Sequence, residues 1–514
     1  MGYRKILFFG MLVLLAGVLV ACSPETEDTY VIGDEQGDWG FPSPFATYPR
    51  GPGFVRTSLI FDSLIWKDED GFVGALAEEW SLDEEELIYT FELREDVKWH
   101  DGDTFTAEDV VFTYEYFQEH SFAFAEVDNV KEVEKIDDYR VEMRLKEPDA
   151  SFINNVAGVV PVIPAHIWED VEDPEEFTGP EAVIGSGPYR LEDYNREQGR
   201  YRYTAFEDYF LGNPGVDNML MVQVGDPQLE LQKGNVDYVR IQPEAAEELE
   251  KQGLNVEAGT HDWNLKLMFN HREAPFEEVE FRRALALGID LEELVERALR
   301  GHGLPGSPGM LSPDNRWYCQ EIPDYSFDPE SAEEKLEKLG YSREGEHLVD
   351  ENSEEISVEL LGLADYAREA EIVAEHLEEL GIEVELRTGE RSVVDAAIRN
   401  WNFDLAITGH GAVGGDPDVA SRFMVGKSSP HLNARYEDEE LIDLLRRQGR
   451  ELDAEKREDL VCRVQQVYAE ELPSYTLHHP TWYYGFNDEV DWFFTRDGLG
   501  SGIPMPLNKL ALVE

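Results

Sequence analysis

The chain has 514 residues, in which 109 Asp and Glu stand against 44 Lys and Arg, so its formal net charge is −65. A chain of this length can bury a large core without disulfide bonds, and two or three lobes are expected. Its 42% hydrophobic content excludes a disordered chain, and its negative charge argues against a nucleic-acid partner, because phosphate binding needs clustered Lys and Arg.

The acidic residues are spread along the whole chain rather than gathered in one tail. In dilute salt such a charged surface repels itself, whereas near 1 M salt the Debye length falls to about 3 Å and the repulsion is screened. We interpret the composition as an adaptation to a saline medium, that is, as halophilic. The alternative is an ordinary acidic secreted protein.

A positively charged N-terminus precedes an apolar run, residues 6–21, that is short for a membrane span and typical of a signal peptide. The run ends in Leu-Val-Ala before Cys22, an arrangement that resembles a bacterial lipobox, in which the cysteine carries the lipid. We predict a signal peptide over residues 1–21, a lipid-anchored linker over residues 22–29, and a location on the extracytoplasmic face of the cell membrane. The alternative is plain secretion with an incidental Cys22.

Two further cysteines, Cys319 and Cys462, are far apart in the sequence. Outside the cytoplasm they can form one disulfide bond, or they can be two isolated buried thiols, and spacing alone does not decide between these. There is no CxxC or Cys/His pattern. We therefore predict neither a metal site nor a cofactor.

Between Trp66 and Pro180 the sequence alternates aromatic and polar residues, for example in Tyr89–Leu93 and Arg140–Leu145. This alternation predicts an antiparallel sheet. A helix is expected over residues 107–117, with Thr106 as its N-cap and the acid three residues later completing a capping box. These features are structural and carry no chemistry.

Short helices and strands alternate further along the chain. Pro227–Lys233 is predicted as a helix and Val236–Arg240 as a strand. After residue 264 the order is β-α-β-α-β, over Ile356–Gly362, Tyr366–Leu380, Ile382–Leu386, Ser392–Asn400 and Phe403–Thr408. This order predicts two α/β lobes, each with a largely parallel sheet covered on both faces.

The chain also resembles the large solute-binding proteins of ABC importers, of the dipeptide, oligopeptide and nickel type. The motifs that carry the resemblance lie in order along nearly all of the chain after the signal peptide. They are Leu76–Ser81, Tyr89–Arg94, Val97–Val111, Ile184–Tyr189, Met268–His271 with Pro275-Phe276, Phe281–Asp290, and Gly301–Gly303 with Pro305 and Pro308.

The resemblance implies an α/β, periplasmic-binding-protein-like fold of type II, in its large three-domain variant. Two lobes form a clamp, and an antiparallel lobe is inserted into the first. The chain would cross between the lobes near Trp263 and near Tyr483, and these crossings would act as hinges. The expected parts are lobe I (residues 30–63, 184–263 and 484–514), the inserted lobe (64–183) and lobe II (264–483).

The resemblance further implies a monomeric receptor that captures a small solute, with a peptide expected, and delivers it to an ABC permease and its ATPase in the membrane. One alternative is a receptor of the same fold for a metal chelate, an oligosaccharide or an anionic solute. Another is a sensor or scavenger without a permease of its own. No GxSxG or HExxH motif is present, so we predict no catalytic residues and no enzyme activity.

The ligand site is expected at the loop after the strand Phe403–Thr408. Peptide-binding relatives commonly place an aspartate there, and in this chain the position is assigned to His410, between Gly409 and Gly411. A neutral imidazole offers no fixed countercharge to an ammonium group, which weakens the peptide interpretation. Asp416 and the neighbouring Asp418 are candidates to replace the acid, or they form a turn.

Other site candidates follow from the resemblance and from position. Arg368 matches an arginine that holds the ligand carboxylate in peptide-binding relatives, or it is a solvated residue paired with Glu371 or Asp365. Trp401 and Trp263 wall the cleft or pack in the core. The remaining candidates are Tyr30, Gly33 and the segment Gly37–Tyr48 from lobe I, and Asn270, which can bond to the ligand or to the hinge backbone.

Overall fold

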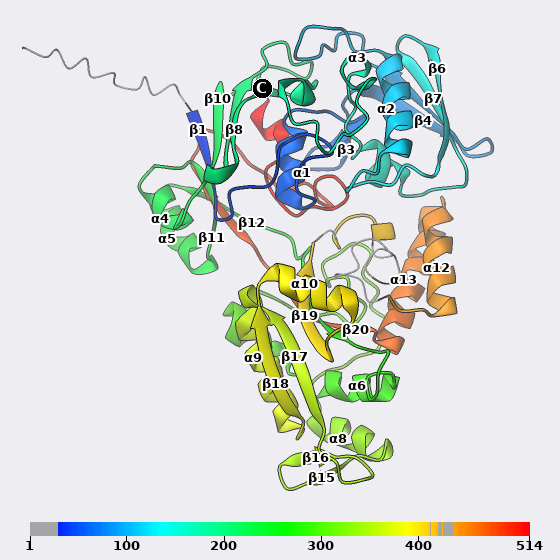
Figure 1. The fold of residues 1–514 in the computed structure, drawn as a ribbon, viewed down its shortest axis with the longest axis vertical. Coiled ribbons are helices and arrows are strands. Elements are labelled where there is room, and N and C mark those ends of the chain that lie inside the picture. Colours follow the sequence, from blue (N-terminus) through cyan, green and yellow to red (C-terminus); the bar gives the residue numbers. More distant parts are fainter. Residues whose placement is uncertain (1–28, 412, 420–423, 425–434, 514) are drawn as a thin grey trace, which may run out of the picture.

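The computed structural model describes residues 29–411, 413–419, 424 and 435–513. The predicted signal peptide and Cys22 lie outside these residues. Figure 1 shows two bodies stacked along the long axis, with lobe I and the inserted lobe in one and lobe II in the other. Among the described residues, no helix combines the length and the apolar character that a membrane crossing requires.

Lobe I is built on a seven-stranded mixed sheet. The central strand β1 (Thr29–Asp34) runs parallel to β10 (Asn218–Gln223) and β11 (Tyr238–Ile241). The other strands pair antiparallel, and the full order is β12 (Asn255–Ala258), β21 (Tyr483–Phe486), β11, β1, β10, β9 (Arg200–Ala205) and β8 (Tyr189–Asn195). Helices of this part of the chain are α1 (Gly51–Ser58), α4 (Pro227–Gln232) and α5 (Ala246–Lys251).

The inserted lobe contains the antiparallel sheet that the sequence predicts. Its order is β4 (Ala77–Asp83), β5 (Ile88–Leu93), β7 (Arg140–Leu145) and β6 (Val130–Asp137), accompanied by α2 (Ala107–Glu119), α3 (Ala165–Trp168) and the hairpin β2–β3 (Ile65–Lys67, Phe72–Gly74). The capping box before α2 is confirmed, because the Thr106 hydroxyl accepts a hydrogen bond and the Thr106 N–H donates to Asp109 Oδ2 at 2.9 Å. One hydrophobic core runs through lobe I and the inserted lobe, so these two parts form one body.

The motif Ile184–Tyr189 packs tightly against the chain at residues 60–62 within this body. A side chain at Gly185 would place its Cβ 2.0 Å from the Ile60 carbonyl oxygen, so only glycine allows the two backbones to approach. The Ser186 hydroxyl donates to Asp62 Oδ2 at 3.0 Å, and the same buried carboxylate pairs with Lys509 near the C-terminus. The motif therefore serves packing.

Lobe II is built on a six-stranded sheet. Strand β17 (Ser357–Leu363) runs parallel to β18 (Glu383–Gly389) and β19 (Leu405–His410). The order is β14 (Gly303–Pro305), β20 (Ser474–Pro480), β13 (Asn264–Phe269), β19, β17 and β18. The prediction of largely parallel sheets is wrong in both lobes. Among the described strands of each sheet, only three neighbours pair parallel, and the other pairs are antiparallel. Strands that enter from the other lobe, β13 in lobe II and β21 in lobe I, run against the neighbouring strands of the β-α-β units.

Helices cover both faces of the lobe II sheet. One face packs on α6 (Val279–Leu287), α7 (Leu291–Leu299), α8 (Pro329–Lys338) and α9 (Ala367–Glu379), and the other on α10 (Arg391–Asn400). A further cluster surrounds α12 (Glu439–Arg450) and α13 (Ala454–Glu471), and the hairpin β15–β16 (Ser342–Glu344, His347–Val349) lies at the far end (Figure 1).

Part of the acidic excess serves as helix N-caps. Five helices, α4, α7, α8, α12 and α13, begin after an aspartate whose carboxylate accepts a hydrogen bond from the backbone N–H three residues later. Such a cap satisfies a donor that the helix leaves open, and it favours the helix dipole. The capping residues are Asp226, Asp290, Asp328, Asp438 and Asp453.

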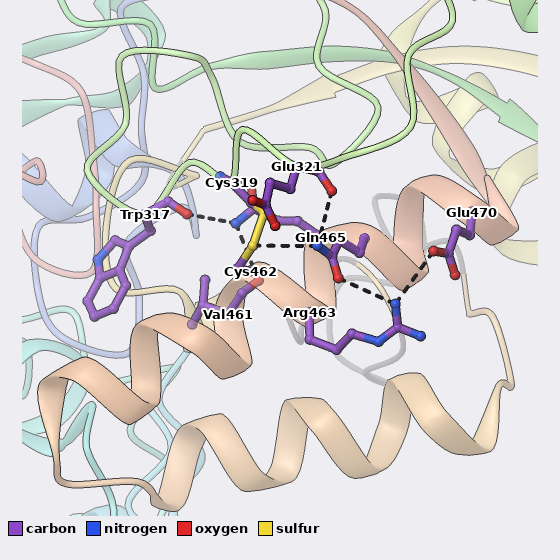
Figure 2. The surroundings of a disulfide bond; sticks show 9 residues. Trp317, Cys319, Glu321, Val461, Cys462, Arg463, Gln465 and Glu470 are labelled. Atoms are coloured by element: carbon purple, nitrogen blue, oxygen red, sulfur yellow. Dashed lines mark hydrogen bonds and ion pairs between the residues drawn. A yellow bond between two sulfur atoms is a disulfide. The ribbon is translucent and has the colours of Figure 1, made fainter.

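Cys319 and Cys462 form a disulfide bond, with their Cα atoms 4.9 Å apart. The bond fastens the loop before α8 to the middle of α13 (Figure 2). Gln465, one turn along α13, accepts from the Cys319 N–H at 3.1 Å and donates to the Trp317 carbonyl at 2.6 Å. The two cysteines are therefore paired and are not two isolated thiols, a question that their spacing in the sequence left open.

Candidate ligand-binding site

The chain passes between the two sheets twice, over residues 259–263 from β12 to β13 and over residues 481–482 from β20 to β21. The two crossings touch each other. Trp263 and Trp482 lie with their ring centroids 5.1 Å apart, and the Gly259 N–H donates to the Trp482 carbonyl at 2.7 Å. His261 Nε2 lies 2.8 Å from Thr481 Oγ1. The crossings are therefore one compact connection rather than two independent linkers.

The carboxyl ends of the parallel strands in the two lobes face each other. Arg50, from the segment after β1, reaches Asp395 of α10 at 3.9 Å. Tyr366 lies just after β17, and burial raises the pKa of its hydroxyl to about 12. The positive charges of Arg391 and, from lobe I, of Arg240 act on the same hydroxyl and lower its pKa. Ligands of open α/β sheets bind outside the carboxyl ends of their strands. We call this region between the strand ends the interlobe junction.

The end of β1 supplies an ordered acidic group at the junction. Although burial raises its pKa, the Arg56 guanidinium and several hydrogen bonds hold the pKa of Asp34 below its usual value. Arg56 Nη2 lies 2.9 Å from Asp34 Oδ2, and Trp39 Nε1 donates to the same oxygen at 2.7 Å. The segment Gly37–Tyr48, which the sequence places after the first strand, is thereby anchored to the strand end.

Tyr30 and Gly33, two predicted site residues, lie within β1 itself and pack in the lobe I interior. Tyr30 is fully buried, and its hydroxyl accepts from Trp492 Nε1 at 2.9 Å. A Cβ at Gly33 would lie 2.8 Å from Val239, so that position is reserved for sheet packing. Both positions are thus used for packing inside lobe I.

At the end of β19, Gly409 and Gly411 make room for Trp263. A Cβ at Gly409 would lie 2.8 Å from Trp263 Nε1, and one at Gly411 would lie 3.4 Å from the same ring and from Pro504 of lobe I. The far side of Trp482 is covered by Arg240, whose guanidinium carbon lies 4.4 Å from the ring centroid. These residues form a continuous stack at the hinge side of the junction.

His410 lies between these glycines and is 1% exposed. Burial, the positive charge of Lys266 and that of Arg50 hold its pKa well below the ordinary value, so the imidazole is neutral. Its Nδ1 lies 3.2 Å from the Gly411 carbonyl oxygen. Lys266 is also fully buried, on β13 opposite Thr408, and burial lowers its pKa to about 7. His410 of β19 and Lys266 of β13 thus place no negative charge beside the junction.

Asp416, the second candidate for the ligand-binding acid, is used inside lobe II. Arg457 of α13 binds it through both guanidinium nitrogens, and both side chains are 7% exposed. Asp416 Oδ1 also accepts from the Asp418 N–H at 2.9 Å, which is the turn interpretation of this sequence. A carboxylate that is already paired in this way offers no countercharge to a ligand, so for Asp416 the structure favours the turn interpretation.

Arg368 is exposed in the first turn of α9, and no ion pair joins it to another residue that the structure describes. The predicted alternative, pairing with Asp365, is not what the structure has, because Asp365 pairs with Arg391 at 2.7 Å. Arg240, on the lobe I side, is likewise exposed and meets no carboxylate within ion-pair distance in the described part of the chain. Both guanidinium groups are therefore open to an incoming anion.

Trp401 and Asn270 make their contacts within lobe II. Trp401 lies between the guanidinium groups of Arg272, at 3.9 Å, and Arg435, at 4.5 Å. Asn270 Nδ2 donates to the Phe403 carbonyl at 2.9 Å. These contacts hold the turn between α10 and β19. For Trp401 the structure favours the packing interpretation, and the Asn270 amide bonds to the backbone of this turn rather than to the hinge backbone.

One His–Asp group can be examined as a metal site. His166 Nε2 lies 2.8 Å from Asp101 Oδ2 and 3.6 Å from Asp103 Oδ2, at the surface of the inserted lobe. The group is exposed and joins the loop that holds Asp101 and Asp103 to α3. We assign it a structural role only.

Sequence reasoning missed Trp482, Arg240, Arg50 and Asp395. Trp482 carried a usable signal, because it lies beside the second crossing as Trp263 lies beside the first. Arg50 and Asp395 carried none, since their pairing depends on how the two lobes meet.

Two lobes joined by paired crossings, with strand ends facing across the junction, define the class of solute-binding clamps. Residues 71–430 match the family model of the bacterial extracellular solute-binding proteins, family 5, and the chain belongs to this family. Its members are transport receptors rather than enzymes.

Among curated proteins, the di/tripeptide-binding protein 3 of Pseudomonas aeruginosa is 26% identical over 504 residues, covering 88% of this chain and 91% of that protein. The oligopeptide-binding protein AppA of Bacillus subtilis is 27% identical over 77% of this chain and 76% of its own. Among solved structures, AppA with a nonapeptide has a TM-score of 0.76 at 23% identity, covering 93% and 98% of the two chains. NikZ of Campylobacter jejuni with Ni(L-His) has a TM-score of 0.79 at 20% identity, covering 93% and 97%.

Proposed function

We propose that this chain is the receptor of an ABC importer, which captures a peptide or a similar small solute at the interlobe junction and delivers it to a membrane permease. The observation that carries the proposal is the double crossing. Along the part of the chain that the structure describes, the lobes are joined through residues 259–263 and 481–482, while the ends of their parallel strands face each other. Such a body can open and close as two rigid parts.

The mechanism that this arrangement supports is a population shift. A solute that touches both lobes favours the closed state by the contacts it makes only there. The family and the names of its relatives support a transport role, and a relative in Listeria monocytogenes is titled an ABC transporter substrate-binding protein. The permease would then recognise the closed, loaded form.

The chemistry of the junction supports an anionic or carboxylate-bearing solute. Arg368 and Arg240 are exposed without carboxylate partners among the described residues, and His410 is neutral. A guanidinium binds a carboxylate through two parallel hydrogen bonds. Relatives are named for di- and tripeptides and for haem, and solved neighbours hold peptides or nickel chelates. A peptide bound by its carboxyl end is our first candidate, and a metal chelate with carboxylate groups is the second.

Replacing Arg368 by Ala tests this assignment. Native mass spectrometry of the purified chain identifies a co-purifying solute, and a thermal-shift screen of dipeptides, Ni(L-His) and haem identifies binders. We expect the Arg368→Ala variant to bind the best of these about tenfold or more weakly, since a charged hydrogen bond of about 1.5–3 kcal/mol is lost. Its melting temperature without solute should be unchanged.

Arg399→Ala is the matched control, because Arg399 is another exposed arginine on a lobe II helix. It should leave both affinity and melting temperature as they are. Equal affinity of Arg368→Ala and wild type would refute the role of Arg368.

We further propose that Cys22 carries a lipid that holds the receptor on the extracytoplasmic face of the membrane. The lipobox-like sequence before it supports this. A Cys22→Ser variant should appear in the soluble fraction, and its retention on membranes would contradict the anchor. Stimulation of a cognate transporter ATPase by the loaded protein would separate an importer receptor from a sensor or scavenger.

A further inference from the structure

The inserted lobe touches lobe II at a place distant in sequence from both crossings. The Ala150 N–H donates to the Gly449 carbonyl at 2.8 Å, and Glu147 forms an ion pair with Arg450. In Figure 1, α12 and α13 rise along one side of the molecule toward the inserted lobe. We call the contact between residues 147–150 and residues 448–450 the side contact.

Both partners of the side contact are held in place by their own lobes. On the inserted lobe, Asn129 exchanges two hydrogen bonds with the backbone of Glu147, each 3.1 Å long. On lobe II, a side chain at Gly449 would place its Cβ 2.8 Å from Asp418 Oδ1, so the end of α12 lies directly against the loop after β19. The contact is therefore made by two ordered surfaces rather than by two exposed loops.

A buried guanidinium connects the side contact to the loop after β19. Arg457 Nη1 lies 2.8 Å from Asp416 Oδ2 and 3.4 Å from the Ala150 carbonyl oxygen. Arg457 Nε also donates to the Gln448 carbonyl at 3.1 Å. One side chain thus contacts the loop after β19, the end of α12 and the inserted lobe. A movement of that loop changes the geometry available to Ala150.

We propose that the side contact is a latch for the closed state, so that the inserted lobe takes part in closure and not only in the architecture of lobe I. The inference rests on the proposed clamp function. The inserted lobe shares its core with lobe I, so an inserted-lobe contact with lobe II exists only when the lobes are together. Any contact made in one state alone shifts the population toward that state. Arg457 contacts both Ala150 of the side contact and Asp416 in the loop after β19, so one side chain is shared by the latch and that loop.

Amide hydrogen exchange at Ala150 reports the latch directly, because its N–H crosses between the lobes. The experiment uses the full purified chain, first stripped of solute and then loaded with the best binder from the thermal-shift screen, at one fixed salt concentration. In the loaded wild type we expect exchange at Ala150 to be about tenfold or more slower than in the stripped chain. Arg450→Glu places two acids together, and exchange should become about fivefold to tenfold faster, since an exposed ion pair is worth up to about 1 kcal/mol and repulsion replaces it.

The double variant Glu147→Arg/Arg450→Glu restores an ion pair of opposite polarity and should return exchange to within about twofold of the wild type. Arg447→Glu is the matched control, because Arg447 lies one turn earlier on α12 and pairs with Asp443 of the same helix. It should leave Ala150 unchanged. An unprotected Ala150 in the loaded wild type, an effect of Arg447→Glu equal to that of Arg450→Glu, or no rescue by the double variant would overturn the latch.

Failure of the latch and failure of the receptor function are distinguishable. If Ala150 is already protected in the stripped chain and no solute changes the separation of the lobes, the receptor function fails and the contact is a fixed interface. If solutes close the lobes while Arg450→Glu has no effect on Ala150, the receptor function stands and the latch fails. Melting temperatures of all three variants, measured in parallel, should lie close to that of the wild type, because the replaced side chains are exposed.

Discussion

Individual carboxylates of this chain occupy two kinds of environment. The N-cap aspartates are at the surface, where the helix end favours their charge. Asp262, at the first crossing, is only 7% exposed, and burial raises its pKa to about 6, with Asp314 and Asp497 nearby adding repulsion. Asp314 is the opposite case, because its hydrogen bond with His261 lowers its pKa to about 2.

The raised pKa of Asp262 predicts how its neutralisation changes stability. The folded chain keeps a proton on Asp262 up to about pH 6, whereas the unfolded chain loses it near 3.8. Asp262 therefore gives most stability below pH 4, and that stability is lost as the pH rises through 6. Asp262→Asn should raise the free energy of unfolding at pH 8 by up to about 3 kcal/mol and leave it nearly unchanged at pH 4.

Denaturant titrations at the two pH values measure this difference. Asp314→Asn is the control of opposite sign, since it removes a favoured negative charge and should destabilise the chain at pH 8. A less stable Asp262→Asn variant at pH 8 would show that the buried carboxylate is held in its charged form after all.

At the same scale, the sequence predicted local hydrogen bonding well and the orientation of site residues poorly. The Thr106 capping box depends on neighbours within one turn and was predicted correctly. Tyr30 and Gly33 are predicted to follow the first strand and face the cleft, but both lie inside β1 and are buried there. Asp416 was left open because its partner, Arg457, is 41 residues away in the sequence.

Helices and strands were placed within a few residues, because the β-α-β-α-β order of lobe II is written in local hydrophobic periodicity. The direction of the remaining strands could not be predicted in this way. Strand β13 enters from the other lobe, so it runs antiparallel to β19, and nothing local in Asn264–Phe269 reports where the preceding residues come from. The pairing of Cys319 with Cys462 depends on the same kind of distant information.

The disulfide bond is the covalent link between the loop before α8 and α13, across a sequence separation of 143 residues. Closing a loop of this length removes entropy from the unfolded chain worth up to about 5 kcal/mol. We expect the double variant Cys319→Ser/Cys462→Ser to be roughly 2–5 kcal/mol less stable. Guanidinium unfolding of both proteins measures this, and the variant treated with a reducing agent should show no further loss. Equal unfolding midpoints would mean that the bond adds no stability.

At the scale of the whole molecule, the net charge of −65 sets the conditions for folding. Repulsion within such a surface weakens the compact state in dilute salt, and screening restores it. We expect the melting temperature to rise steeply between 0.1 and about 2 M KCl, as the Debye length falls from about 10 Å toward 3 Å. Calorimetry over a salt series measures the dependence. A melting temperature that does not change with salt would contradict the interpretation of the charge as saline adaptation.

The clamp itself is a property of the whole molecule, since it needs two rigid bodies and a compact connection at Trp263 and Trp482. Small-angle X-ray scattering of the purified chain, first stripped of bound solute and then loaded with the best binder from the screen, measures the movement directly. The account predicts a smaller radius of gyration for the loaded chain and recovery of the larger value after the solute is removed. An unchanged radius, with binding of the same solute demonstrated in the same sample, would contradict closure and with it the assignment of the junction as the capture site.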